Sequence, residues 1–324
     1  MMKRVAQILV CLAVCAMAVP AALLAEDRKP SYPNKPVSYF IPFGAGGESG
    51  IAARLQQSFF KSLTGQDLVI SYRPGGGGAV MWDEINNLPG DGYSIVGINL
   101  PHIVLQPMLG AKYKTRDITG VFLFHYTPDA VVVHEDSPFE TLDQLIEFAR
   151  ENPGKIMFSG SGRGSANHLA QIRFDKLAGI ETKYRPYKGT AASISALVKG
   201  KVNASWGYTT VGTTYPDDVR LLAVATKDRQ PRFPDVPTFT EKGFEIINGA
   251  YRGIAVPKST SKKTRLALSK LFEQINKDPA MRQEMEDRGF APVDIPYPKV
   301  AEFIKARTVE YLTHAKQVGL GTKK

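Results

Sequence analysis

The stretch "IPFGAGGESGIAARLQ", Ile41–Gln56, decides the fold because it passes from strand to loop to helix. Apolar residues precede Gly44, four glycines lie from Gly44 to Gly50, and Ile51 and Leu55 then recur at helical spacing. Glycines let the backbone approach a ligand, and the N-terminus of the following helix offers unpaired N–H groups and the positive end of its dipole. The stretch therefore predicts an anion-binding loop at the end of a strand.

The spacing of this loop, and of a second one, excludes the common nucleotide motifs. Gly44–Ser49 and Gly160–Ser165 both read G-x-G-x-x-S, whereas the dinucleotide fingerprint needs glycine at the sixth position. The chain has no Gly-Lys-Ser/Thr for a Walker loop, and neither loop matches the lipase-type G-x-S-x-G. Phosphate sites usually recruit Arg or Lys, and Arg163 is the only such residue in these loops. A carboxylate is therefore a better candidate ligand for these loops than a phosphate.

A third segment repeats the same chemistry. "YKGTAA", Tyr187–Ala192, places a glycine and a hydroxyl between a strand end and a helix start. Ligands of open α/β sheets bind at loops beyond the carboxyl ends of strands, so we expect the three loops to line one cleft. Ser49 and Ser165 are expected to cap their helices or to turn their hydroxyls toward the ligand.

The order of apolar runs and helical patterns predicts the architecture. Strands alternate with helices along the chain, which favours α/β architecture with mostly parallel sheets in two lobes. "VFLFHY" and "AVVVHE" are predicted as separate strands, and the second of them is expected to cross between lobes. "GAYRGIAV" is expected to return the chain to the first lobe. Two crossings predict a hinge.

Composition and the N-terminus narrow the class of protein. The chain has 324 residues, a formal net charge of +10 and two cysteines. Residues 1–25 show a charged start, an apolar run and small residues, which predicts a cleaved secretory signal and a periplasmic location. Both cysteines, Cys11 and Cys15, lie in that segment, so disulfides and thiolate catalysis are excluded from the mature chain. The positively charged residues are dispersed along the sequence rather than clustered in one stretch, which argues against nucleic-acid binding.

Several motifs then resemble one known family. "FIPFGAGG", "YRPGGGGAV", "DGYSIV", "YRPYKGTAA" and "PDVPTFTEKGFE" occur in order and resemble the extracytoplasmic solute receptors of tripartite tricarboxylate transporters, the Bug-type receptors. The resemblance runs from about residue 32 to the C-terminus. It implies a type II periplasmic binding protein fold, with two α/β lobes, a ligand cleft between them and a two-crossing hinge. The expected lobes are residues 32–131 plus 252–324, and residues 132–251.

The resemblance also implies the function. We expect a receptor, not an enzyme, that closes on a small organic anion such as a di- or tricarboxylate and delivers it to the membrane permease subunits. The five histidines show no metal-ligand spacing, so no metal or cofactor is expected, and the receptor is expected to be a monomer. Two alternatives stay open: a ligand-sensing subunit of a two-component system, and an enzyme using His168 with Ser161 or Ser165.

The expected ligand-binding residues combine the three loops with polar residues at other strand ends. They are Phe43, Gly44, Ala45, Gly46, Gly47, Glu48, Ser49, Asn99, His102, Ser159, Ser161, Ser165, Asn167, His168, Lys188, Gly189, Thr190, Ala191 and Tyr208.

Some positions depart from the family pattern or are assigned elsewhere. The acid that commonly begins the first helix is replaced by Gly50, which argues against an amino-acid ligand unless Glu48 substitutes for it. Trp206 is expected in the core. Asp129, Glu135 and Asp136 are expected at the hinge surface rather than in catalysis.

Overall fold

The computed structural model describes residues 32–321, and the chain divides into the units Met1–Asn34 and Lys35–Lys324. The predicted signal segment, residues 1–25, lies outside the described residues. All that follows concerns the second unit. Within the described part of the chain, no helix is both long and apolar enough to cross a membrane.

The strands of this unit form one connected network. Their order is β2-β1-β3-β9-β4-β7-β5-β6, and β8 and β10 each pair with β4. The strands are β1 (Val37–Ile41), β2 (Leu68–Tyr72), β3 (Ser94–Leu100), β4 (Thr119–His134), β5 (Met157–Gly160), β6 (Lys183–Pro186), β7 (Ala204–Tyr208), β8 (Val219–Val224), β9 (Gly249–Val256) and β10 (Ala291–Pro296).

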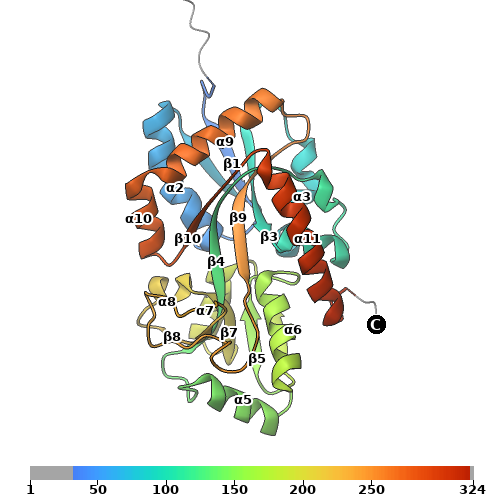
Figure 1. Ribbon diagram of the computed structural model, residues 1–324, viewed down its shortest axis with the longest axis vertical. Helices are drawn as coiled ribbons and strands as arrows, with labels where there is room; N and C mark the ends of the chain where they lie inside the picture. Colours follow the sequence, from blue (N-terminus) through green and yellow to red (C-terminus); the bar gives the residue numbers. More distant parts are fainter. Residues whose placement is uncertain (1–31, 322–324) are drawn as a thin grey trace, which may run out of the picture. The chain divides into compact units, whose positions relative to one another are not determined.

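Strand β4 connects the two halves of the network, and Figure 1 shows it running with β9 through the middle of the molecule. Its first part pairs with β9 and β10 as far as Pro128, and its last part, from Asp129, pairs with β7 and β8. The prediction of two separate strands here is wrong. Proline has no N–H to donate, and it is tolerated inside this long strand at the point where the pairing partners change.

The prediction of mostly parallel sheets is also wrong for the middle of the network. β1 pairs in parallel with β2 and β3, and β5 pairs in parallel with β6 and β7. By contrast, β4 pairs antiparallel with β7, β8, β9 and β10, and β3 pairs antiparallel with β9. Strands that cross between halves return in the opposite direction, so antiparallel pairs gather around them.

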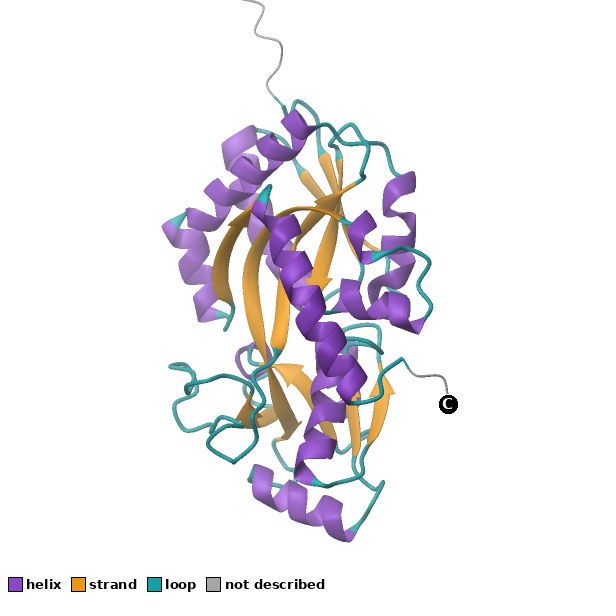
Figure 2. Ribbon diagram, turned by 45° about the vertical axis from the view of Figure 1, so that its right-hand side comes forward, coloured by secondary structure: helices purple, strands orange, loops and turns teal. Residues whose placement is uncertain are grey.

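Helices cover both faces of the strands, as Figure 2 shows. The α-helices are α2 (Glu48–Thr64), α3 (Ala79–Glu84), α4 (His102–Leu105), α5 (Leu142–Glu151), α6 (Ala166–Ala178), α7 (Thr190–Val198), α8 (Thr210–Thr214), α9 (Lys262–Lys277), α10 (Pro279–Asp287) and α11 (Lys299–Gln317). Short 3₁₀ turns are η2 (Gly76–Gly78), η3 (Ile85–Asn87), η4 (Gln106–Leu109) and η5 (Thr115–Asp117).

Aromatic side chains anchor the core of each half. Trp206 on β7 is fully buried and stacks on Phe239 with ring centroids 5.3 Å apart, which confirms its predicted place in the core. In the other half, the Trp82 indole N–H donates to the Gly97 carbonyl at 2.9 Å, so the buried ring keeps a partner for its polar atom. Rigid packing on both sides of β4 leaves the loops between the halves to form the site.

Candidate ligand-binding site

A small cavity of about 10 Å³, room for about one water molecule, lies where loops from both halves meet. Its lining residues come from the segments that follow β1, β3 and β5, from the end of β7, from the starts of α2 and α7, and from β9. They are Phe43, Gly47, Glu48, Ser49, Asn99, His102, Ser161, Gly189, Thr190, Tyr208 and Arg252.

The first loop brings the N-terminus of α2 to the cavity. Helix α2 begins at Glu48, and its N-cap residue, Gly47, has no side chain to satisfy the first N–H groups. Gly46 has a φ of +78°, a conformation that favours glycine, and a Cβ there would lie 3.4 Å from that of Ala191. The loop therefore needs glycine both for its turn and for its close approach to the opposite half.

The loop before α7 supplies a second helix N-terminus. Helix α7 begins at Thr190 after Gly189, which again offers no side-chain cap. The N–H of Gly44 donates to the carbonyl of Lys188 at 2.9 Å, so the first and third loops contact each other directly. Two helices thus direct uncapped N-termini toward one buried space. Such N-termini carry partial positive charge and unpaired N–H groups, and they bind anions.

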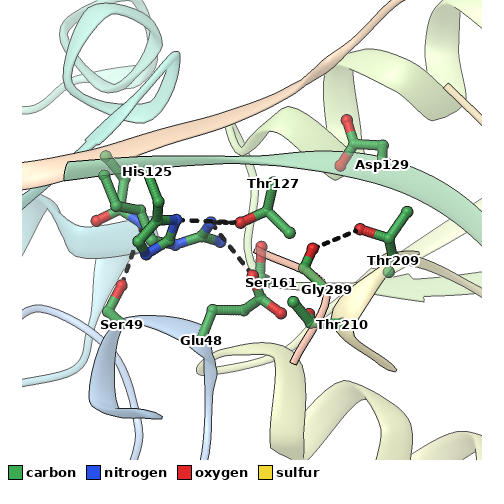
Figure 3. Close-up of polar contacts among 12 residues, drawn as sticks. Glu48, Ser49, His125, Thr127, Asp129, Ser161, Thr209, Thr210 and Gly289 are labelled. Carbon is green, nitrogen blue, oxygen red and sulfur yellow. Dashed lines mark hydrogen bonds and ion pairs between the residues drawn. The ribbon is translucent and has the colours of Figure 1, made fainter. Parts of the chain in front are cut away.

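A buried ion pair forms part of the cavity wall. A guanidinium nitrogen of Arg252, Nη1, lies 3.2 Å from Glu48 Oε2, and both side chains are less than 5% exposed, at 3% and 4%. The same nitrogen donates to the hydroxyl of Thr127 at 2.8 Å. Figure 3 shows Glu48 and Thr127 beside each other, with Ser161 close by.

Further contacts hold Arg252 in place. In the amide orientation that satisfies its neighbours, the Asn99 oxygen accepts from Ser49 Oγ and from Arg252 Nε, each at 3.2 Å. The guanidinium also lies over the ring of Tyr208, 4.6 Å from its centroid. The cation is therefore fixed by groups of the protein on several sides.

Burial shifts the pKa values of the ionisable lining residues. Burial raises the pKa of Glu48 to about 7, although Arg252 and the Thr127 hydroxyl oppose the shift. Burial, with a smaller effect from Arg252, lowers the pKa of His102 to about 3, so this imidazole is neutral at neutral pH. The Phe43 ring meets that of His102 edge-on at 5.5 Å.

The second loop sends one side chain to the cavity and connects it to the crossing strand. Ser161 Oγ donates to Asn167 Oδ1 at 2.6 Å, and Asn167 Nδ2 donates to Asp129 Oδ1 at 2.7 Å. The other oxygen of Asp129 accepts from Asn248 Nδ2 at 2.6 Å. A chain of hydrogen bonds therefore leads from the cavity to β4 and to the segment just before β9. The prediction that Asp129 lies at the surface is wrong, because the residue is fully buried.

The rest of the second loop contacts the tetraglycine turn. A Cβ on Gly162 would lie 3.0 Å from the Cα of Gly77, in the tetraglycine turn of η2. Gln106 Nε2 donates to the carbonyl of Arg163 in the same region. The two G-x-G-x-x-S loops therefore share the cavity through Ser161, while most of the first loop contacts the third loop and most of the second contacts the tetraglycine turn. A wider open groove lies here, and the exposed Lys188 is among its lining residues.

The structure brings ten of the expected ligand-binding residues to the cavity and places the others around it. Those outside the lining are Gly44, Ala45, Gly46, Ser159, Ser165, Asn167, His168, Lys188 and Ala191. The hydroxyl of Ser159 donates to the Ser193 carbonyl at 3.2 Å, beneath the loop.

The two serines expected as helix caps behave differently. Ser165 is the N-cap of α6, and its hydroxyl accepts from the His168 N–H at 3.1 Å, as predicted. Ser49 is not a cap, because α2 begins one residue earlier and its hydroxyl contacts Asn99 instead. The His168 ring nitrogen Nδ1 accepts from the Gly164 N–H at 3.2 Å.

Arg252 is the lining residue that the sequence reasoning missed. It is the single charged residue of the strand "GAYRGIAV", which was interpreted only as a crossing strand. A charge inside a strand that is otherwise apolar must be paired when buried, and that was the available signal.

Comparisons with known proteins identify the family of the chain. Residues 51–319 match the family model described as the tripartite tricarboxylate transporter family receptor. The chain belongs to this receptor family. The receptor is 30% identical to a UPF0065 protein in the tcbD-tcbE intergenic region of Pseudomonas sp. (strain P51), over 94% of this chain and 95% of the relative.

Solved structures show the same fold. The periplasmic binding protein BugD matches with a TM-score of 0.84 and 25% identity, over 89% of this chain and 99% of BugD. A protein from R. palustris solved with adipate matches with a TM-score of 0.84 and 24% identity, over 89% of this chain and 98% of that one. The expected type II periplasmic binding protein fold is confirmed, and the receptor binds solutes, as its family does.

Proposed function

We propose that the receptor works in the periplasm, where it binds a small carboxylic acid between its halves and delivers it to the membrane permease subunits of a tripartite transporter. Residues 1–25 would direct its export. The binding is non-catalytic, and the ligand stabilises the closed form because it contacts both halves only when they are closed. We propose the lobe boundaries expected from the sequence, between residues 131 and 132 and between residues 251 and 252.

The observation that carries this proposal is the meeting of two uncapped helix N-termini at one buried cavity. The first residues of α2 and α7, Glu48 and Thr190, both line it. A carboxylate placed there would accept hydrogen bonds from N–H groups of both halves. Each hydrogen bond to a charged group contributes about 1.5–3 kcal/mol. A few such bonds support micromolar affinity, which corresponds to about 8 kcal/mol.

A panel of organic acids tests the proposal directly by isothermal titration calorimetry and thermal shift. We expect at least one carboxylate to bind and to raise the melting temperature. If no organic acid on a broad panel binds or stabilises the receptor, the proposed function is wrong.

A proline substitution tests the role of the backbone N–H groups. Thr190→Pro removes the N–H of the first residue of α7, a position where proline fits a helix. We expect an affinity loss of roughly 10- to 150-fold, the equivalent of one charged hydrogen bond. Thr190→Ala measures the share that comes from the hydroxyl. Lys262→Pro makes the same backbone change at the first residue of α9, outside the cavity, and is expected to leave affinity unchanged.

A further inference from the structure

Above the pKa of Glu48, the charges in the cavity wall cancel each other. Among the eleven lining residues, all within the described part of the chain, Arg252 is charged and Glu48 becomes charged as the pH rises above about 7, and the two side chains then form an ion pair. His102 adds no positive charge because burial keeps its imidazole neutral. Behind the wall lies the carboxyl group of Asp129, two hydrogen bonds away from Ser161. No net positive charge of side chains is therefore available to a ligand.

Arg252 has several partners in the protein, whereas Glu48 Oε2 has the ion pair with Arg252 but no hydrogen bond within the described residues. The guanidinium contacts the hydroxyl of Thr127, the amide of Asn99 and the ring of Tyr208, besides the carboxylate of Glu48. Glu48 Oε2 has no hydrogen-bond donor within the described residues, although it is buried and lies in the ion pair. The free capacity at this end of the cavity is that of a hydrogen-bond acceptor.

Two other polar atoms of the wall are also unpartnered within the described residues. They are His102 Nδ1 and the hydroxyl oxygen of Tyr208. A neutral imidazole nitrogen and a phenol both pair well with a hydroxyl or an amino group, and neither supplies a positive charge. The cavity therefore offers one anion site, at the helix N-termini, and polar groups without net positive charge around a carboxylate oxygen that is ion-paired but accepts no hydrogen bond within the described residues.

We propose that the receptor selects small acids with a single carboxylate and a hydrogen-bond donor elsewhere on the molecule, and that Glu48 is the residue that rejects a second carboxylate. This inference rests on the proposed function and narrows its ligand class. The ligand carboxylate binds the N-termini of α2 and α7, and its hydroxyl or amino group donates to Glu48. A second carboxylate would lie beside Glu48 with the compensating cation already used, and like charges placed together are strongly unfavourable in a buried site.

Pairs of acids that differ only in their far end test this specificity. We would measure the affinities of 3-hydroxypropionate and malonate, of 4-hydroxybutyrate and succinate, and of 6-hydroxyhexanoate and adipate by calorimetry at pH 8. At this pH Glu48 is mainly ionised, since its pKa is about 7. For the wild-type receptor we expect the hydroxy acid of the best-binding pair to bind at least about tenfold more tightly than the diacid.

The Glu48→Gln variant assigns this preference to the carboxylate. Glutamine keeps the shape and removes the charge, so we expect the affinity ratio to move toward the diacid by at least about tenfold. Glu147→Gln removes an exposed carboxylate on α5 and is expected to leave the ratio unchanged. Circular dichroism checks that each variant is folded. If Glu48→Gln does not fold, the affinity ratio of the wild-type receptor still tests the specificity.

Each result separates the two proposals. A wild-type receptor that binds a diacid as tightly as its hydroxy acid overturns the proposed specificity and leaves the proposed function standing. A wild-type preference that persists in folded Glu48→Gln overturns the assignment to Glu48. If no acid of any pair or of the broad panel binds, the proposed function itself fails.

Discussion

The buried carboxyl group of Asp129 predicts how the stability of the receptor depends on pH. The residue lies on β4 where the strand changes partners, and two asparagine side chains, Asn167 and Asn248, donate to its oxygens at 2.7 and 2.6 Å. Burial raises its pKa to about 8, although these hydrogen bonds oppose the shift. The pKa of Glu48 is raised to about 7 by burial as well.

The sign of the effect follows from the protons bound in each state. Above about pH 5 these two carboxyl groups are ionised in the unfolded chain but still hold protons in the folded receptor. The stability they contribute is complete at low pH and is lost as the pH rises toward 8. The histidines act in the opposite direction, because the pKa values of His102, His125 and His168 are lowered and their neutral forms favour folding only above the pKa of the unfolded chain.

From pH 6.5 to 8 the carboxyl groups lose more stability than the histidines gain. Linkage gives a loss of about 2 kcal/mol in the free energy of unfolding from the carboxyl groups, most of it from Asp129, and a gain of about 1 kcal/mol from the three histidines, so the net loss is about 1 kcal/mol. Urea titrations of the ligand-free receptor, followed by the fluorescence of its buried tryptophans, measure this loss. Asp129→Asn is expected to abolish the net loss.

The test is the change in stability of Asp129→Asn with pH, not its stability at any one pH. Asparagine can accept only one of the two hydrogen bonds, so a separate cost of about 1–3 kcal/mol is expected at every pH. Asp143→Asn, which removes an exposed carboxylate paired with Lys242, serves as the control. If Asp129→Asn loses stability between pH 6.5 and 8 as steeply as the wild type, the reasoning about the buried carboxyl group is refuted.

Three further substitutions probe the loops and the cavity. Tyr208→Phe removes a hydroxyl that has no partner within the described residues, so we expect urea unfolding to change by less than about 1 kcal/mol and calorimetry to show weaker ligand binding. Gly77→Ala places a Cβ 2.6 Å from the Arg163 carbonyl, so it is expected to hinder closure and to reduce affinity at least several-fold, and unchanged affinity would count against this closing contact. Ser165→Ala removes the N-cap of α6 and is expected to lower the free energy of unfolding by about 1 kcal/mol, with little change in affinity.

The first and third loops of the site could be predicted from the sequence, because glycine spacing is a local signal. Gly47 and Gly189 each precede a helix, and both line the cavity as predicted. The opposition of the second loop to Gly77 could not be read from the sequence, since it depends on how the halves close. Arg252 lies far along the chain from Glu48, and only the pairing of β9 with β4 places it beside Thr127.

A helix and a strand near the C-terminus were not predicted, although a local sequence signal marks the start of the helix. Helix α10 and strand β10 follow helix α9 and were not predicted from the sequence. Asp278 and Pro279 are nevertheless a strong helix start, because Asp278 accepts from the N–H groups of Ala280 and Met281 and proline fits the first helical position. The continuity of β4 through Pro128 was missed for the opposite reason. Proline usually ends a strand, and only the change of partners at that residue makes it acceptable.

The unpartnered atoms of the cavity explain why closure and specificity belong together. In this structure Glu48 Oε2, His102 Nδ1 and the hydroxyl of Tyr208 are buried and lack hydrogen-bond partners within the described residues. Each buried and unsatisfied polar group costs about 1–3 kcal/mol, so closing on an empty cavity is unfavourable. A ligand favours closure to the extent that it satisfies these atoms in the closed form alone. An acid without a donor leaves Glu48 Oε2 without a hydrogen bond, and a diacid adds repulsion beside Glu48, so both stabilise the closed form less than a hydroxy acid does.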